Sequence, residues 1–179
     1  MKHIKENPTP QQNEAGRYGY INADNEIVIP FEYDDIFVYD YTEKIFFRVE
    51  KDGKFGIIDV TGKLILPVEY ETIGASYYID SNDDKIFFTA KKDNKFGFFN
   101  SDGIMILPSI YDNMSPHFTD ETDFLEVHKD KKWGVIGSDG EIIIPFEYDW
   151  LKFAKKYFST AKNTEDTAVV ICPNEETQR

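Results

Sequence analysis

An internal repeat constrains this chain more than any other feature of its sequence. An aromatic residue followed by glycine occurs four times, and the four glycines are 37, 41 and 37 residues apart. A proline stands eleven residues after each glycine, and a tyrosine three residues after each proline. The four copies contain Tyr18, Gly19, Pro30 and Tyr33; Phe55, Gly56, Pro67 and Tyr70; Phe96, Gly97, Pro108 and Tyr111; and Trp133, Gly134, Pro145 and Tyr148. Such fixed offsets indicate that each copy is one supersecondary unit in an array.

Each full copy contains three apolar runs that predict three β-strands. Strand A precedes the aromatic–glycine pair, as in residues 45–50, and strand B contains that pair, as in residues 55–58. Strand C is the run just before the proline, as in residues 64–66. Aromatic residues make up 16% of the chain, and they favour strands. We expect a three-stranded antiparallel meander that ends at the proline, because proline has no N–H to donate to a β-ladder.

The residues between these strands are typical of tight turns. Asp52-Gly53 and Asp93-Asn94 predict two-residue hairpins between strands A and B, because glycine and asparagine tolerate a positive φ. Gly62 and its equivalents Gly103 and Gly140 predict a type I turn closed by a left-handed residue between strands B and C. In the first copy this position is Asn25, which also tolerates the left-handed region.

The glycine beside each aromatic residue needs a physical reason, because glycine inside a strand costs about 0.5–1 kcal/mol relative to alanine. A bare backbone allows an aromatic ring to lie flat across it. We therefore expect the four rings, from Tyr18 to Trp133, to be buried and to stack from copy to copy. The aromatic, glycine and proline positions of the repeat are thus interpreted as structural.

Together these patterns predict an all-β fold of repeated three-stranded antiparallel β-meander units. We expect them to stack as an open curved array, with a propeller-like ring as the alternative. Residues 1–15 predict a flexible lead-in, residues 16–173 a single repeat domain, and residues 174–179 a polar tail. A degenerate fifth copy is expected, with Tyr157–Ala161 as strand A and Thr167–Val170 as strand B.

The repeated pattern resembles the WG (KWG) repeat of bacterial proteins, most literally at Lys132-Trp133-Gly134-Val135-Ile136. The resemblance covers residues 16 to 170, although three copies replace the tryptophan by Tyr18, Phe55 or Phe96. It implies a β-rich array without a defined chemistry, and a binding or scaffolding role by analogy.

The charged residues are unevenly distributed. The net charge is −13, which disfavours nucleic acid and favours a basic protein partner. The segments between strand C and the next strand A, residues 34–43, 71–84 and 112–123, contain acids but no lysine or arginine, whereas the A–B turns are rich in lysine. Solvated loops are often charged without any function. The alternative is an acidic docking face made by Asp34, Asp35, Asp40, Tyr41, Tyr77, Tyr78, Asp80, Asp83, Asp84, Phe118, Asp120, Glu121 and Asp123.

Motifs for catalysis or cofactor binding are missing from the sequence. There is no phosphate-binding loop, nucleophile elbow or HExxH motif, so we expect no enzyme and no cofactor. The three histidines are scattered, and the acids at positions 80–84 lack the glycine and the final acid of a calcium loop. We therefore expect no metal. Cys172 is interpreted as an apolar filler. No signal peptide or membrane-spanning run is visible, so a cytoplasmic location is expected.

The leading hypothesis is a non-enzymatic protein-binding module. Within that class, an immunity-type protein that neutralises a basic bacterial toxin fits a small acidic chain, because an acidic face can block a cationic active site without catalysis. One alternative is a scaffold whose acids only solubilise it. Another is a carbohydrate- or ligand-binding protein, which requires the rings of the aromatic–glycine pairs to be exposed.

Overall fold

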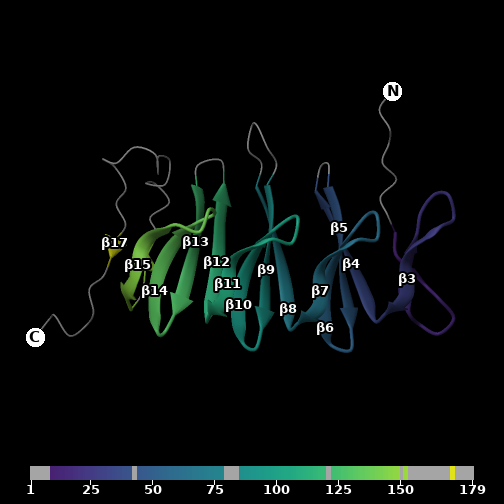
Figure 1. Cartoon of the computed structure of the whole chain (residues 1–179), viewed down its shortest axis with the longest axis horizontal. Helices are drawn as coiled ribbons and strands as arrows, with labels where there is room; N and C mark the ends of the chain where they lie inside the picture. The colour runs from purple at the N-terminus through teal and green to yellow at the C-terminus, as the bar shows by residue number, and fades with distance from the viewer. Residues whose placement is uncertain are drawn as a thin grey trace, which may run out of the picture. The chain divides into compact units, whose positions relative to one another are not determined.

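A computed structural model describes residues 9–41, 44–78, 85–119, 122–149, 151–152 and 170–171 of the 179. The elements in these ranges are β-strands arranged in antiparallel sheets, and none of the sheets closes into a barrel (Figure 1). No helix in these ranges is long and apolar enough to cross a membrane. The chain divides into two compact units, residues 1–73 and 74–179. The prediction of an all-β fold of repeated meanders is confirmed.

The first unit contains two sheets. The smaller sheet has the strand order β1 (Gln11–Gln12), β2 (Tyr18–Ile21), β3 (Ile27–Tyr33). The larger has the order β4 (Asp35–Tyr41), β5 (Lys44–Lys51), β6 (Lys54–Asp59), β7 (Leu64–Tyr70). Strands β2 and β3 form copy 1, and the larger sheet forms copy 2.

The second unit contains the sheets of copies 3 and 4. Copy 3 comprises β8 (Thr72–Tyr78), β9 (Lys85–Lys92), β10 (Lys95–Asn100) and β11 (Met105–Tyr111), and the unit boundary falls within β8. Copy 4 comprises β12 (Asn113–Thr119), β13 (Thr122–Lys129), β14 (Lys132–Gly137) and β15 (Ile142–Tyr148). A short sheet of β16 (Leu151–Lys152) and β17 (Val170–Ile171) follows.

The predicted three-stranded unit is wrong in one respect, because each full copy has four strands. The segments expected to be linkers form β4, β8 and β12, and β4 and β12 pair along their whole length with β5 and β13. A single residue, such as Asp34 or Asp112, separates strand C of one copy from the first strand of the next sheet. The N–H of Asp34 donates to the carbonyl of Glu50 at 2.7 Å, which attaches the bend to the new sheet.

Strand C continues past the proline instead of ending there. In copy 1, Tyr18 pairs with Tyr33 and Tyr20 with Ile29, so the intervening Gly19 faces a three-residue bulge that contains Pro30. The same register shift occurs in the other three copies. The proline is tolerated because it stands in a bulge on an edge strand, where no ladder hydrogen bond is required.

This bulge explains the glycine beside the aromatic residue. A Cβ added at Gly19 would lie 2.8 Å from the carbonyl oxygen of Ile29 and 2.8 Å from the ring of Phe31. Phe146 covers Gly134 in the same way, whereas Val68 and Ser109 take that place over Gly56 and Gly97. A ring across the glycine is therefore confirmed for copies 1 and 4, and smaller side chains perform the same packing in copies 2 and 3.

The turns follow their predicted chemistry. Asp52 and Gly53 have φ values of 53° and 70°, as a two-residue hairpin between β5 and β6 requires. Gly62 has a φ of 85°, and its N–H donates to the carbonyl of Asp59. A Cβ on Gly62 would also lie 2.5 Å from the carbonyl oxygen of Val28 in copy 1. Glycine is thus required at position 62 both by the positive φ and by the contact with copy 1. Asn25, with a φ of 62°, occupies the equivalent position in copy 1 itself.

The turn between β13 and β14 gives a first testable prediction. Lys131 has a φ of 66°, and the left-handed region costs about 1–2 kcal/mol for a residue with a side chain. Lys131→Gly should therefore raise the free energy of unfolding. The increase should be only about 0.5–1 kcal/mol, because glycine also raises the conformational entropy of the unfolded chain. Gly53→Lys, at the equivalent turn position with open space around it, should lower it by about 1 kcal/mol. Urea unfolding of both variants checks this, and equal signs would contradict it.

The core of the first unit lies between its two sheets. Ile29 and Tyr33 of β3 pack against Phe47 and Val49 of β5 and Ile36 of β4. On β5, Phe46 and Phe47 point to opposite faces, yet their exposed fractions are 5% and 0%. Both faces of this sheet are therefore covered, which is why its strands are apolar on successive residues.

The core of the second unit lies between the sheets of copies 3 and 4. Phe98 of β10 is fully buried and stacks on Phe87 of β9, with 4.9 Å between ring centroids and an interplanar angle of 22°. Leu125 and Val127 of β13 and Ile136 of β14 complete this cluster from copy 4. A smaller cluster of Phe124, Val135 and Ile144 covers part of the other face of the copy 4 sheet.

The two ends of the array differ from the prediction. Within the expected lead-in, Gln11 pairs with Gly19, so β1 takes the place of strand A in copy 1. At the other end, Leu151 pairs with Ile171, so the fifth copy begins with β16 and β17. The segment predicted as its strand A, and the polar tail 174–179, lie outside the described residues.

Candidate docking surfaces

The acid that follows the tyrosine of each copy makes local contacts. Asp34 pairs with Arg17, and its other carboxylate oxygen accepts the N–H of Asp52 at 2.7 Å. Asp112 pairs with Lys95 and accepts the N–H of Asp130 at 3.1 Å. In both cases the carboxylate connects the base before strand B of one copy to the A–B turn of the next.

These pairs have a constant spacing in the sequence. The base lies 17 residues before the acid in Arg17–Asp34, Lys95–Asp112 and Lys132–Asp149. The first acid of the acidic segments 34–43 and 112–123 therefore lies beside a lysine-rich A–B turn. These pairs are solvent-exposed, so each contributes little to the stability of the fold.

Asp112 gives a pH prediction. A hydrogen bond from Lys95, with smaller contributions from the charge of Lys95, the Asp130 N–H and His128, lowers the pKa of Asp112. The unfolded carboxyl titrates near pH 4, so this carboxylate stabilises the fold above about pH 4, and its contribution is lost as the pH falls through the folded pKa. Asp112→Asn should lose less stability than the parent between pH 6 and pH 3. Asp24→Asn, in an exposed turn, is the control, and an equal loss in Asp112→Asn and the parent would contradict the prediction.

Strand β4 carries the part of the predicted acidic face that the structure describes best. Asp35 and Asp40 are exposed, and Phe37 is 51% exposed. The rings of Tyr39 and Tyr41 are parallel, with 5.9 Å between their centroids. Burial, and then the neighbouring Tyr39, raises the pKa of Tyr41, so its hydroxyl is protonated at neutral pH.

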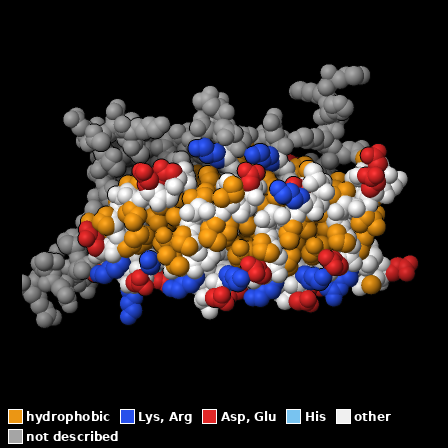
Figure 2. All heavy atoms as spheres, viewed as in Figure 1, with side chains coloured by type: hydrophobic (Ala, Val, Ile, Leu, Met, Phe, Trp, Pro, Cys, Tyr) orange, Lys and Arg blue, Asp and Glu red, His pale blue; other side chains and the backbone are white. Residues whose placement is uncertain are grey.

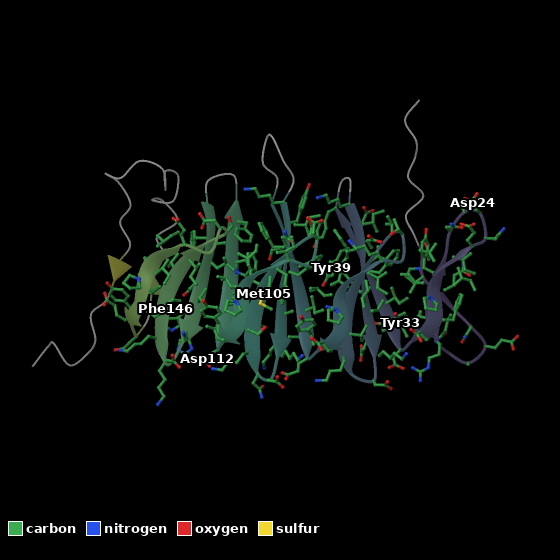
Figure 3. All side chains as sticks on the ribbon, in the orientation of Figure 1. Asp24, Tyr33, Tyr39, Met105, Asp112 and Phe146 are labelled. Atoms are coloured by element: carbon green, nitrogen blue, oxygen red, sulfur yellow. The ribbon has the colours of Figure 1, made fainter. Side chains whose placement is uncertain are left out.

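The guanidinium of Arg48 organises this strand from β5. It lies 5.3 Å from the centroid of Phe37 and 6.0 Å from that of Tyr39, and donates to the carbonyl oxygen of Ile73 at 3.3 Å. Tyr39 is labelled in Figure 3. This arrangement fixes the aromatic row of β4 on its own sheet.

The remaining residues of the predicted acidic face divide into three groups. Tyr77 is half-buried on β8, and Phe118 is half-buried on β12, where its ring lies 5.1 Å from that of Phe87 and belongs to the core. Tyr78 and Asp123 lie on β8 and β13, but their side chains are outside the description. The acids between the paired strands also lie outside the described residues: Asp80, Asp83, Asp84, Asp120 and Glu121.

The rings of the aromatic–glycine pairs are half-buried, not fully buried as expected. Phe55 lies 5.3 Å from Arg48 and Phe96 5.7 Å from Lys91, while Trp133 packs on His128 at 4.8 Å between centroids. These three rings thus pack on strand A of their own copies, whereas Tyr18 packs against the core cluster of the first unit. The expected stacking of these rings from copy to copy is therefore wrong. These contacts also leave less of each ring for a sugar.

A surface that the sequence did not predict lies along strand C. The first residue of this strand is apolar and exposed in every copy: Ile27 (64%), Leu64 (49%), Met105 (51%) and Ile142 (62%). The four prolines are exposed on the same edge strands. We call this set of first residues and prolines the strand C face. Figure 2 shows hydrophobic side chains on the surface turned to the viewer, and Figure 3 labels Met105.

The strand C face lies on an edge strand whose backbone is poorly suited to pairing with a further strand. In each sheet of a full copy, strand C has one neighbouring strand. Within the described ranges, no strand pairs with its other side. The proline removes a donor, and the bulge interrupts the ladder. A partner would therefore contact this face mainly through side chains rather than by adding a strand.

The family comparison agrees with this geometry. The model of the WG containing repeat matches residues 18–55, 55–96 and 133–158, which together are more than half of the chain. The chain is a WG-repeat protein. No curated protein and no solved structure matches it.

The WG-repeat protein also has a segment of the repeat that the family model does not match. Residues between 96 and 133 fall outside the matched ranges, yet β10 and β11 of copy 3 pair with the same bulge as in the other copies. The fold of the repeat is therefore maintained where its sequence departs from the family pattern.

The two histidines in the described part of the WG-repeat protein each lie near an acid. His117 lies 3.3 Å from Glu126, and His128 lies 3.6 Å from Asp112. Among the residues with described positions, no group of three histidine, cysteine or acidic side chains is placed to hold a metal ion.

Proposed function

We propose that this WG-repeat protein is a non-enzymatic protein-binding module that contacts its partner through the strand C face. The observation that carries the proposal is the exposed apolar residue at the start of strand C in all four copies. Scattered exposed apolar residues are normal, but here every copy exposes an apolar residue at the same position of the repeat.

A basic partner fits the charge of the molecule. The net charge of −13 would accelerate the approach of a cationic protein and disfavour acidic ones. Exposed acids such as Asp24, Asp102 and Asp139 stand in the turns that lead into strand C. In this proposal the exposed apolar residues of strand C provide the contact area, and the acids select the partner.

The finer form of the proposal is an immunity-type protein that neutralises a basic toxin in a bacterial cytoplasm. Neutralisation requires only that a cationic site be covered, which suits a rigid sheet edge. The chain would be co-expressed with the product of each gene that adjoins its own, and growth and complex formation would be measured. We expect restored growth and a 1:1 complex that weakens as salt is raised.

The control variants assign the effect to the strand C face. Replacing Ile27, Leu64, Met105 and Ile142 by serine should abolish the complex without unfolding the chain, because the four side chains are exposed. Val60→Ser removes an apolar side chain that is 44% exposed in a turn and should leave the complex intact. A protein that neither binds nor protects against either neighbouring product is not an immunity protein, and a complex indifferent to the serine variant does not use this face.

A further inference from the structure

Copy 3 departs from the other copies at two exposed positions. Seven residues after the motif glycine the other copies have Glu26, Lys63 and Glu141, whereas copy 3 has Ile104, which is 62% exposed. Thirteen residues after it, the other copies have Glu32, Glu69 and Glu147, whereas copy 3 has Ile110, which is 40% exposed.

Folding does not account for these two isoleucines. The other three copies form the same strand pairs and the same bulge with charged residues at both positions. An exposed isoleucine gains little from burial in the free protein, so contact with another molecule is needed to bury it further.

The second unit exposes three further apolar residues on strand C of copies 3 and 4, and the turn before β15 lies against β11, since a Cβ on Gly140 would lie 3.6 Å from Cδ2 of Leu107. Met105 follows Ile104 at the start of β11, and the second unit also exposes Ile142 (62%) and Ile143 (57%) on β15. Ile106 and Phe146, from the same two strands, are half-buried and pack on the core of this unit. We call Ile104, Met105, Ile110, Ile142 and Ile143 the copy 3–4 patch.

The charge beside this patch has one sign at the B–C turns. Asp102 in the turn before β11, and Asp139 and Glu141 in the turn before β15, are exposed. These two turns, residues 101–104 and 138–141, contain no lysine or arginine. In the first unit, by contrast, Lys63 stands in the turn before Leu64.

We propose that the copy 3–4 patch is where the partner docks, and that it binds a segment with apolar side chains flanked by lysine or arginine. This inference rests on the proposed protein-binding function and gives it a location and a ligand chemistry. A second molecule of this chain fits poorly as the partner, because each molecule carries a net charge of −13 and the contact would bring acids against acids. Strand addition also fits poorly, because Pro108 lacks the N–H needed to continue a ladder along β11.

The test uses the full chain and three labelled twelve-residue peptides. One alternates leucine and lysine, one alternates serine and lysine, and one alternates leucine and glutamate. Fluorescence anisotropy at 150 mM salt should show binding of the leucine–lysine peptide and at least tenfold weaker binding of the other two, because both apolar contact and positive charge are required.

The decisive variant is Ile104→Glu/Ile110→Glu, which gives copy 3 the acids found at these positions in other copies. It should bind the leucine–lysine peptide at least tenfold more weakly although it is more acidic, with an unchanged thermal midpoint. Val60→Glu, which places an acid in an exposed turn of copy 2 outside the strand C face, should bind within twofold of the parent.

Three results would overturn the proposal. Stronger binding by the Ile104→Glu/Ile110→Glu variant would mean that charge alone attracts the peptide. An equal loss in Val60→Glu would mean that the copy 3–4 patch has no special role. A dimer in sedimentation that this double variant dissociates would make a second copy the occupant. None of these results affects the co-expression test, so failure of this proposal is distinguishable from failure of the proposed function.

Discussion

Gly56→Ala is expected to lower the free energy of unfolding by about 3 kcal/mol, because overpacking a site that cannot relax costs about 1–3 kcal/mol or more. A Cβ at Gly56 would lie 2.7 Å from Cγ2 of Val68, 2.9 Å from the carbonyl oxygen of Leu66 and 3.1 Å from Cα of Val68. Two of these three atoms belong to the backbone of the β7 bulge. Relief would therefore require the bulge to move, and with it the pairing of Phe55 with Tyr70.

Gly74→Ala is the matched control, because Gly74 also lies inside a strand. Its added Cβ would meet only the side-chain oxygen of Thr89, at 3.0 Å. We expect a change within about 0.5 kcal/mol, since a small side-chain rotation offsets the gain in strand preference. Urea unfolding of both variants measures the difference, and equal stabilities would mean that the glycine beside the aromatic residue has no packing role.

Phe98→Ala is expected to lower the free energy of unfolding by about 3–5 kcal/mol, the range for a buried phenylalanine. Phe98 has no exposed surface, stacks on Phe87, and lies 6.0 Å from the ring of Phe118. Its loss would open a cavity between the sheets of copies 3 and 4, which share this cluster.

Phe37→Ala provides the comparison for Phe98→Ala, because it makes the same chemical change where half of the side chain is exposed. It should cost less than about 1 kcal/mol. Denaturant unfolding followed by circular dichroism measures both variants. A cost for Phe98→Ala as small as that for Phe37→Ala would show that copies 3 and 4 do not share a core.

Much of the repeat could be predicted from sequence because its signals are local. Glycine or asparagine at a positive φ, as at Gly62 and Asn25, marks a turn regardless of tertiary context. The fourth strand was missed because its alternation is masked. On β4, Ile36 and Val38 face the core. The residues on the other face, Phe37, Tyr39 and Tyr41, are aromatic rather than polar. Period-two patterning disappears when both faces carry apolar side chains.

Strand β12 shows a second reason for the missed strand. Ser115-Pro116-His117 has no strand preference, and proline usually argues against a strand. Pro116 nevertheless pairs with Leu125, because β12 is an edge strand and can present the proline away from its neighbour. Edge position is a property of the whole sheet, so this strand could not be inferred locally.

The candidate site was less predictable than the fold. The segments with many acids attracted attention, yet Asp34 and Asp112 make contacts within the repeat. The constant 17-residue spacing of base and acid was a signal for those contacts. The departure of Ile104 and Ile110 from the other copies was also visible in the sequence, but their exposure depends on strand C being an edge, which required the sheet order.

Residue-resolved amide hydrogen exchange on the full chain tests most directly the claim that each full copy is a four-stranded sheet. We predict that the amides of β4, β8 and β12 that face β5, β9 and β13 exchange as slowly as those of strands A and B, because they lie in hydrogen-bonded ladders. If the amides throughout residues 35–41, 72–78 and 113–119 exchange at the rate of an open loop, the four-stranded unit is contradicted and the three-stranded meander is favoured.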